Sequence, residues 1–400
     1  MTLIADRISN IRPSPTIAVS ELARALRAQG REVFDLGVGE PDTLTPPHAK
    51  VAAIRAIEGD LTRYTQTDGT PSLKQAISEK FRRDNDLVYE PQQITVGSGA
   101  KQVIYNAMLA TLDPGDEVIV PSPCWVSYPD IVLLAGGKPV LVPCSSENQF
   151  KLLASDLAIA ITAKSKWIIL NSPNNPTGSV YTEEELVAIA AVVAKHPQLH
   201  VLSDDIYENI VYDDFRYTTI AQVDPTLMER VLTVNGIAKG YAMTGWRIGF
   251  AGGPETLIKA MAKIQSQTTF CPSSISQIAA EAALTGPQDF LRSQAESFKE
   301  RRDIVLEQMQ RIPGLDCIKP DGAFYVFPCL ANLLGSRQAG GQMIESDQDF
   351  VSYLLEAEGV ATVPGSAFGD EQHFRISYAV SEPILRESCR RIARACKLLT

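Results

Sequence analysis

One lysine of this chain stands in a setting that would make its amine reactive. Lys239 lies within the segment 235–247, which is otherwise made mostly of glycine and apolar residues. Burial disfavours the charged form of an amine and lowers its pKa, so the nitrogen becomes nucleophilic near neutral pH. Arg247, eight positions further on, carries a planar guanidinium that can bind a phosphate group. A surface lysine on an ordinary loop is the alternative interpretation.

A second candidate site is a short turn with the sequence GSGAK at positions 97–101. It follows an expected strand and opens an expected helix, so its free backbone N–H groups and the helix dipole would favour a phosphate. The turn lacks the spacing of a P-loop. A plain tight turn is therefore the alternative interpretation.

Two further loops carry polar side chains that suit a flat ligand. The loop NSPNNPTG at 171–178 combines two prolines with three asparagines, which makes it rigid and polar. In the segment 203–207, Asp204 and Tyr207 are three positions apart and could face one ligand. A carboxylate there can pair with a protonated ring nitrogen, and a phenol can hydrogen-bond a ring oxygen. A helix N-cap at Asp204 or Asp205 is the alternative.

These motifs must be positioned by the elements around them. From about residue 70 the hydrophobic pattern alternates between strands and helices, which predicts an α/β domain with a mostly parallel sheet. Strands are expected at 94–96, 117–120, 166–170, 200–203, 231–234 and 247–250, and helices from Ser72, Ala100 and Thr182, the last with a capping box to Glu185. Ligands bind at the carboxyl ends of parallel strands, where the motifs fall.

The pattern changes after a long helix expected near 288–311. Strands at 324–327 and 373–378 and helices from Asp347 and after Ser381 predict a smaller α+β domain. We therefore expect an N-terminal segment 1–45 that belongs to the small domain and covers the pocket, a large ligand-binding domain at 46–290, and a small C-terminal domain at 291–400.

Composition limits the classes of protein to consider. The chain has 400 residues, of which 45% are hydrophobic and 21% charged, which is enough for two cores. Its net charge of -10 argues against a nucleic-acid partner. Seven cysteines without a CxxC pair and four histidines without metal-ligand spacing predict neither a disulfide framework nor a metal site. With no signal peptide and no membrane-spanning run expected, we predict a cytoplasmic protein.

In combination, the motifs resemble the class I aminotransferases of fold type I. The family pattern K-x-x-x-M-x-G-x-R-x-G matches the residues that begin at Lys239 and end at Gly249. The NNPTG loop, the D-x-x-Y pair and the sequence FRIS at 374–377 follow the family order, and GVGEPD at 37–42 fits as well. The resemblance runs from about residue 10 to residue 390. It implies a pyridoxal-phosphate-dependent aminotransferase, with a large mostly parallel sheet flanked by helices and a smaller α+β domain.

The resemblance also implies a role for each residue around the cofactor ring. Lys239 would form a Schiff base with pyridoxal 5'-phosphate and later move the proton between the substrate Cα and the cofactor. Asp204 would keep the pyridine nitrogen protonated. Tyr207 and Asn175 would hydrogen-bond the ring oxygen, and Trp125 would stack on the ring.

The cofactor phosphate has its own implied set of residues. The amides of Gly99, Ala100 and Lys101 would bind it at the helix N-terminus, with Arg247 closing the site. Tyr64 resembles the tyrosine that reaches the phosphate of a neighbouring subunit, which implies a homodimer with shared active sites. The sequence departs from the family at Gly236, where a serine that binds phosphate is often found.

Substrate binding is implied by a further group of residues. Arg375 would bind the α-carboxylate in a bidentate pair, with help from the Gly39 amide, the Asn175 side chain and Trp125. Lys101 would reach the distal carboxylate of a dicarboxylic substrate, and Thr16 lies in the segment that could cover the pocket. An exposed helix lysine is the alternative interpretation of Lys101.

The expected reaction transfers the amino group of L-aspartate to 2-oxoglutarate, giving oxaloacetate and L-glutamate. The chain is similar to a bacterial branch of aspartate aminotransferases that also contains prephenate aminotransferases, so prephenate is an alternative acceptor. Aromatic or alanine transamination and C–S lyase activity are further alternatives. A regulatory protein that senses the cofactor is disfavoured, because the match begins near the N-terminus and the chain is acidic.

Overall fold

The computed structural model describes residues 3–9, 11 and 15–400. Its centre is a seven-stranded sheet, in which only β8 runs antiparallel to its neighbours. In spatial order the strands are β2 (Ile94–Gly97), β8 (Gly249–Gly252), β7 (Val231–Gly236), β6 (His200–Asp204), β5 (Ser165–Asn171), β3 (Glu117–Ser122) and β4 (Lys138–Pro143). The prediction of a mostly parallel sheet is confirmed.

The central strands form because their runs of apolar residues are buried on both faces, as parallel sheets require. The strand predicted at 247–250 is wrong at its start, since β8 begins at Gly249 and extends to Gly252. Arg247 has a φ of 58°, in the left-handed region, and so it cannot continue a strand. The edge strand β4 lacked a sequence prediction, because much of it is exposed.

Helices cover both faces of this sheet, and side chains that alternate along the strands feed two separate cores. One core joins the sheet to α5 (Ala100–Thr111), α6 (Ser127–Leu134) and α10 (Glu255–Ser266). The other joins it to α3 (Pro47–Glu58), α4 (Pro71–Asn85), α8 (Glu183–Ala194) and α11 (Ser274–Thr285). The capping box predicted for α8 is present, with Thr182 accepting from the Glu185 amide and Glu185 accepting from the Thr182 amide.

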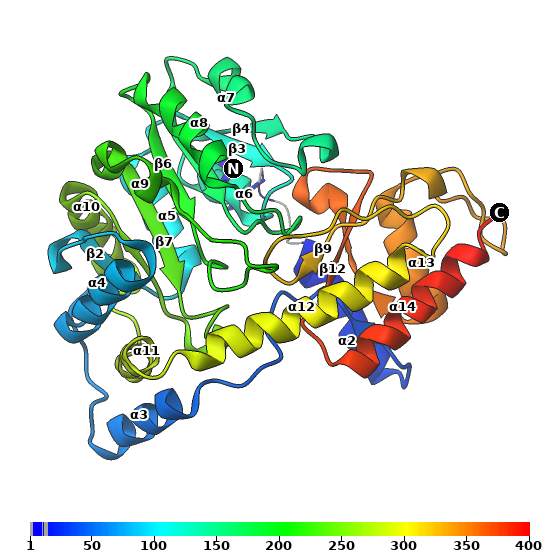
Figure 1. Cartoon of the computed structure of the whole chain (residues 1–400), viewed down its shortest axis with the longest axis horizontal. Coiled ribbons are helices and arrows are strands. Elements are labelled where there is room, and N and C mark those ends of the chain that lie inside the picture. Colours follow the sequence, from blue (N-terminus) through cyan, green and yellow to red (C-terminus); the bar gives the residue numbers. More distant parts are fainter. Residues whose placement is uncertain (1–2, 10, 12–14) are drawn as a thin grey trace.

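A second, smaller sheet lies beside the first, on the right of Figure 1. It consists of β11 (Val363–Pro364), β12 (Phe374–Ser377) and β9 (Tyr325–Val326). A third core packs this sheet against α12 (Asp289–Met309), α13 (Asp347–Glu358) and α14 (Glu382–Lys397). The 21-residue helix α12 extends from the part of the molecule that contains the large sheet to the small sheet (Figure 1). The domain boundaries at residues 45 and 290 stay a prediction.

The N-terminal helix α2 (Pro15–Ala28) packs near β11. Next to it, β1 (Phe34–Asp35) pairs in parallel with β10 (Val360–Ala361), which ties the N-terminal region to the small sheet.

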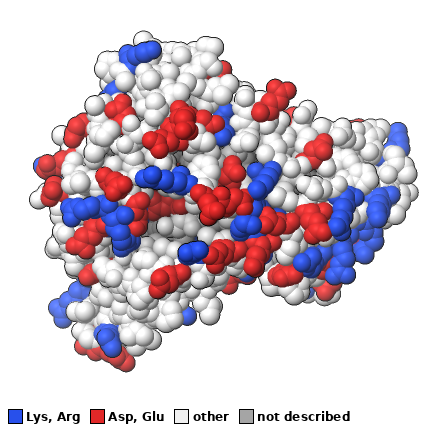
Figure 2. All heavy atoms as spheres, in the orientation of Figure 1, with Lys and Arg blue, Asp and Glu red and all other residues white. Residues whose placement is uncertain are grey.

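Acidic and basic side chains are interspersed over the face shown in Figure 2, with basic side chains gathered over α14. In the described part of the chain, no helix combines the length and apolar character needed to cross a membrane.

Candidate active site

A cavity of about 660 Å³ opens at the carboxyl edge of the large sheet, where the loops after β2, β3, β5, β6 and β7 meet. The small-sheet region closes one side with Tyr325 and Arg375. The cavity brings together most of the residues predicted from the sequence: Gly39, Ala100, Lys101, Trp125, Asn175, Asp204, Tyr207, Lys239, Arg247 and Arg375.

The amine of Lys239 points into this cavity. It donates a hydrogen bond to the carbonyl oxygen of Gly39 at 2.5 Å and lies 5.7 Å from the centre of the Tyr207 ring. Burial, together with the nearby Arg375 cation, lowers the pKa of Lys239 to about 8. About a tenth of this amine is therefore neutral and nucleophilic at pH 7, far more than for an ordinary lysine.

The carboxylate of Asp204 lies at the end of β6 and is buried. The Tyr128 hydroxyl donates a hydrogen bond to its Oδ2 at 2.5 Å, and the amide of Asn171 donates to its backbone carbonyl at 2.9 Å. Burial raises the pKa of Asp204 to about 6, while the hydrogen bond from Tyr128 opposes that shift. A buried acid of this kind is suited to pairing with a cationic group in the cavity.

Arg375 extends from β12 into the opposite side of the cavity. Its Nη1 donates to Asn175 Oδ1 at 2.9 Å and its Nη2 to the Gly37 carbonyl at 2.5 Å. Its buried Nε has no hydrogen-bond partner among the described residues. A buried guanidinium with a donor left over can bind an incoming carboxylate.

The loop at 171–178 holds Asn175 for this purpose. The Asn171 side chain accepts from the Asn175 amide at 2.9 Å, and the peptides before Pro173 and Pro176 are both cis. The loop is therefore fixed by its own hydrogen bonds, as its composition predicts.

The N-terminus of α5 and the side chain of Arg247 meet on a third side of the cavity. The guanidinium donates to the carbonyls of Thr244 and Ser98, and a Cβ added at Gly99 would collide with it. A Cβ at Gly249 would collide with the backbone of Gly99 and Ala100. Only glycine permits this close packing, which leaves the first N–H groups of α5 beside a cation in a site suited to phosphate.

Lys101 and Trp125 form the remaining wall. The Lys101 ammonium lies 4.8 Å from the centre of the Trp125 ring, within the range of a cation–π contact. Burial lowers the pKa of Lys101, and Arg247 adds to the effect. Ser20, Glu21 and Arg24 of α2 line the cavity as well.

Gly99 is not among the residues that line the cavity but packs against Arg247, which does, and Tyr64 does not line the cavity of its own chain. Tyr64 is 87% exposed and packs edge-on against Phe270, 5.2 Å between ring centres. Thr16 falls in the first turn of α2, and its side chain lies outside the described residues.

The cavity is also lined by residues for which the sequence predicts no role, among them the polar residues Asn171, Tyr128 and Tyr325. Tyr128 follows Trp125 by three positions at the start of a helix, a spacing that could have placed both on one side. Tyr325 stands in a short buried strand whose sequence gives no such signal.

The fold and this lysine-bearing cavity define a family. The chain belongs to the class I and II aminotransferases, whose family model matches residues 31–392. It is 53% identical to an aspartate/prephenate aminotransferase of Cereibacter sphaeroides, covering 99% of both chains. It is 54% identical to an aspartate aminotransferase of Rhizobium meliloti, covering 99% of this chain and 97% of the relative.

Solved structures agree with these relationships. The aspartate aminotransferase of Rhizobium meliloti matches with a TM-score of 0.97 at 53% identity, over 100% of both chains. The aspartate aminotransferase of Thermus thermophilus with maleate matches with a TM-score of 0.92 at 42% identity, over 99% of this chain and 100% of that one. The predicted fold class and the prediction of an aminotransferase are confirmed.

Proposed function

We propose that this protein is a pyridoxal-phosphate-dependent aspartate aminotransferase that converts L-aspartate and 2-oxoglutarate to oxaloacetate and L-glutamate. The observation that carries the proposal is the placement of the Lys239 amine in one cavity with a buried acid, Asp204, and a buried cation, Arg375. A cofactor ring and a substrate carboxylate need these opposite charges at their two ends.

The residues around the cavity fit pyridoxal phosphate. The buried carboxylate of Asp204 suits a protonated pyridine nitrogen, and Tyr207 and Asn175 offer donors for the ring oxygen. The N-terminus of α5 and Arg247 suit the phosphate. Trp125 offers an aromatic face in the same cavity.

When bound, pyridoxal phosphate supplies an aldehyde for amines and a ring that withdraws electrons from the adjacent carbon. Lys239 would hold the cofactor covalently. Once an amino acid takes its place, the Lys239 amine would accept the proton of the substrate Cα and return it to the cofactor carbon that carried the aldehyde. Arg375 would fix the α-carboxylate and so orient the Cα–H bond toward the Lys239 amine. The carboxylate of Asp204 would hold the ring proton in place.

Dicarboxylic substrates are favoured by a second cation on the cavity wall. Lys101 lines the cavity beside Trp125, and Arg24 of α2 lines it as well. The solved Thermus thermophilus relative is described with maleate, a dicarboxylate. The names of the relatives and this charge arrangement both support aspartate.

Absorption spectroscopy of the purified protein tests the proposal. We expect a visible cofactor band that shifts to the amine form of the cofactor when aspartate is added, and no such band in Lys239→Ala. Lys259→Ala, on an exposed lysine of α10, is the control and should behave like wild type. A band that ignores aspartate would contradict the substrate, and release of ammonia without a 2-oxo-acid acceptor would identify a lyase instead.

Prephenate is the second candidate acceptor. The Cereibacter sphaeroides relative is named an aspartate/prephenate aminotransferase, and Arg24 adds a cation at the part of the cavity formed by α2. Protein converted to its amine form should return to the aldehyde form when prephenate is added, if this second activity is present.

The proposal also includes a homodimer. Exposed apolar side chains gather on α3 and the segment after it: Val51, Ile54, Ile57, Leu61 and Tyr64. A patch of this kind on a helix face is typical of protein–protein contact. In a dimer, Tyr64 would lie close to the phosphate site of the partner. Seven free thiols support a reducing compartment such as the cytoplasm.

A further inference from the structure

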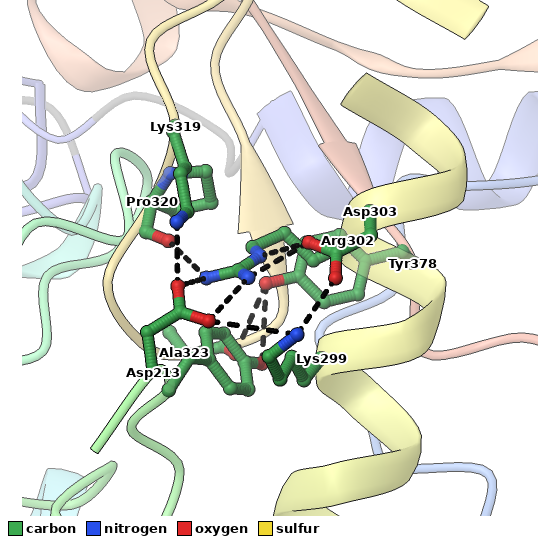
Figure 3. A network of polar contacts seen from close by, with 9 residues as sticks. Asp213, Lys299, Arg302, Asp303, Lys319, Pro320, Ala323 and Tyr378 are labelled. Carbon is green, nitrogen blue, oxygen red and sulfur yellow. Dashed lines mark hydrogen bonds and ion pairs between the residues drawn. The ribbon is translucent and has the colours of Figure 1, made fainter. Parts of the chain in front are cut away.

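A charged network outside the cavity joins three segments that are distant in the sequence (Figure 3). Arg302 of α12 donates to the two oxygens of Asp213 at 2.8 and 3.2 Å, and Lys319 lies 2.6 Å from the same carboxylate. Arg302 also donates to the Pro320 carbonyl at 3.2 Å. Its side chain is only 1% exposed. A guanidinium so deeply buried is stable only when its donors are satisfied, so the network fixes the segment 319–323 relative to α12 and to the loop after β6.

The network continues into two tyrosines that bind one carbonyl. The Arg302 guanidinium lies 4.8 Å from the centre of the Tyr212 ring, and the Tyr212 hydroxyl donates to the carbonyl of Ala323. The Tyr378 hydroxyl lies 3.3 Å from the same carbonyl and 3.2 Å from the Tyr212 hydroxyl. The Ala323 amide donates to Ile210 at 2.9 Å. The backbone N–H and C=O groups of Ala323 are therefore both hydrogen-bonded, the N–H to Ile210 and the C=O to the two tyrosines.

Ala323 needs such support because of its backbone. Its φ is 57°, in the left-handed region, which residues with a Cβ avoid. It is also completely buried, so no contact with water can stabilise it. The hydrogen bonds to Tyr212, Tyr378 and Ile210 offset the cost of this conformation.

The residues that follow Ala323 reach the active site. The Tyr325 hydroxyl is 2.8 Å from that of Tyr207, and its ring centre is 4.5 Å from the Arg375 guanidinium. A Cβ on Gly39 would lie 2.6 Å from the Tyr325 hydroxyl oxygen, so the tyrosine also touches this backbone. Gly39 is the residue that accepts the hydrogen bond of Lys239. Tyr325 therefore contacts Tyr207 and Arg375 directly and touches the Gly39 backbone that accepts the hydrogen bond of Lys239.

We propose that Asp213, Arg302, Tyr212 and Tyr378 form a clamp on Ala323 that positions Tyr325, and through it Tyr207 and Arg375. The clamp residues touch neither cavity nor substrate, so they are positioning residues. If the clamp is broken, Ala323 relaxes toward a negative φ and turns the Tyr325 ring away from Arg375. The inference rests on the proposed function, because Tyr207 and Arg375 act there on the cofactor and the substrate carboxylate.

A fold-stabilising role and a positioning role have different signatures. Loss of a merely structural contact lowers the melting temperature but leaves the affinity of the folded protein unchanged. Loss of positioning weakens carboxylate binding at Arg375 and shifts the pH midpoint of the cofactor band, to which the Tyr207 hydroxyl is coupled. The phosphate site and Lys239 are not in contact with the clamp, so pyridoxal phosphate should remain bound.

The test compares Tyr378→Phe and Arg302→Met with two control variants in the holoprotein. Tyr353→Phe removes another buried hydroxyl that donates to a carbonyl, that of Ala395 at 3.1 Å, and Arg394→Met breaks another arginine pair, with Glu358. Maleate is titrated against the visible cofactor band, and the pH midpoint of that band is measured without maleate. We expect maleate to bind the clamp variants about five- to tenfold more weakly, the effect of about one lost hydrogen bond, with the controls at wild-type affinity.

Ala323→Gly provides a rescue. Glycine adopts a positive φ without a steric cost, so the backbone no longer needs the clamp to the same extent. In the Tyr378→Phe background, Ala323→Gly should restore at least half of the lost maleate affinity. Should Arg302→Met fail to fold, Tyr378→Phe, which removes a single oxygen, carries the test.

The possible failures are separable. Folded clamp variants that bind maleate like Tyr353→Phe and keep the wild-type pH midpoint overturn the clamp while the aminotransferase function stands. Wild-type holoprotein that binds no maleate overturns the dicarboxylate function, and the clamp along with it.

Discussion

The burial of Asp204 suits the proposed cofactor site but lowers the stability of the cofactor-free protein. Burial raises its pKa to about 6, above the ordinary value of an unfolded aspartate. A raised pKa means that the folded state binds the proton more tightly than the unfolded state. The stabilising contribution of the protonated acid is complete below the unfolded pKa near 4 and is lost as the pH rises through about 6.

Asp204→Asn should therefore stabilise the cofactor-free protein. The amide keeps the shape of the side chain without the charge, so we expect the free energy of unfolding to rise by about 3 kcal/mol above neutral pH, with the gain vanishing in acid. Denaturant unfolding across the acid-to-neutral range measures this. Glu300→Gln, an exposed carboxylate of α12, is the control. A gain in stability that does not change with pH would contradict the raised pKa of Asp204.

Lys239 predicts a pH dependence for the capture of the cofactor. Its pKa is lowered to about 8 by burial and by Arg375, and only the neutral amine attacks an aldehyde. The rate at which cofactor-free protein develops the visible band should rise with pH to a plateau, with a midpoint near 8. Stopped-flow absorbance checks this. Arg375→Met removes the second cause of the pKa shift and should raise the midpoint. A wild-type midpoint near the ordinary lysine value of about 10 would contradict the lowered pKa of Lys239.

At the same scale, the sequence predicts residues that belong to linear motifs and misses those that depend on packing. Lys239, Asp204 and Arg375 lie in recognisable strings of residues, and all three line one cavity. Tyr325 is placed in the cavity by contacts that include Tyr207, which is more than a hundred residues away in the chain. No local pattern encodes such a contact, because it depends on how the two sheets meet.

At the scale of elements, the close approach of β8 to α5 is the feature that shapes the phosphate site. A Cβ at Gly249 would collide with the backbone of Gly99 and Ala100, so Gly249→Ala must push the helix N-terminus away from Arg247. We expect pyridoxal phosphate to bind at least about tenfold more weakly, since the phosphate would lose hydrogen bonds to charged or aligned donors. Spectroscopic titration of the cofactor measures this.

The matched control is Gly340→Ala, in a surface turn where an added Cβ meets nothing within 4 Å. It should bind the cofactor like wild type. Equal affinities for the two variants would mean that the contact between β8 and α5 does not position the phosphate site.

The elements also show where sequence reasoning is sound and where it stops. Buried parallel strands such as β5 and β6 are recognisable in the sequence as apolar runs, and α8 is recognisable by its capping box. The start of β8 is missed because the left-handed conformation of Arg247 is imposed by its contacts with Thr244 and Ser98 and not by its residue type. The edge strand β4 is missed because exposed strands lack that apolar signal.

At the scale of the whole molecule, the apolar patch on α3 predicts self-association. Ile54 and Ile57 are 53% and 55% exposed, an unusual state for side chains that water disfavours. Ile54→Glu should weaken the dimer and shift sedimentation toward the monomer at low protein concentration. Ile159→Glu alters a still more exposed isoleucine, 82%, on α7 (Ala154–Ala160) and should leave the sedimentation profile unchanged. A monomeric wild-type protein would contradict the dimer.

Shared active sites can be tested with hybrids of two defective chains. Tyr64→Phe should weaken pyridoxal phosphate binding more than about tenfold, because a hydrogen bond to a charged phosphate is lost. Lys239→Ala cannot hold the cofactor covalently at all. In a hybrid dimer, the lysine of the Tyr64→Phe chain would be paired with the intact Tyr64 of the Lys239→Ala chain, so one of its two sites would be complete.

Mixing the two variants under conditions that exchange subunits should thus create a class of sites with wild-type affinity that neither parent has. The exposed position of Tyr64, remote from the cavity of its own chain, is the reason for expecting this result. Titration of the visible band would resolve the tight class from the weak one. If every lysine-bearing site in the mixture keeps the weak affinity of the Tyr64→Phe parent although subunits have exchanged, each chain builds its site alone, and Tyr64 must reach the phosphate of its own chain or not act on it.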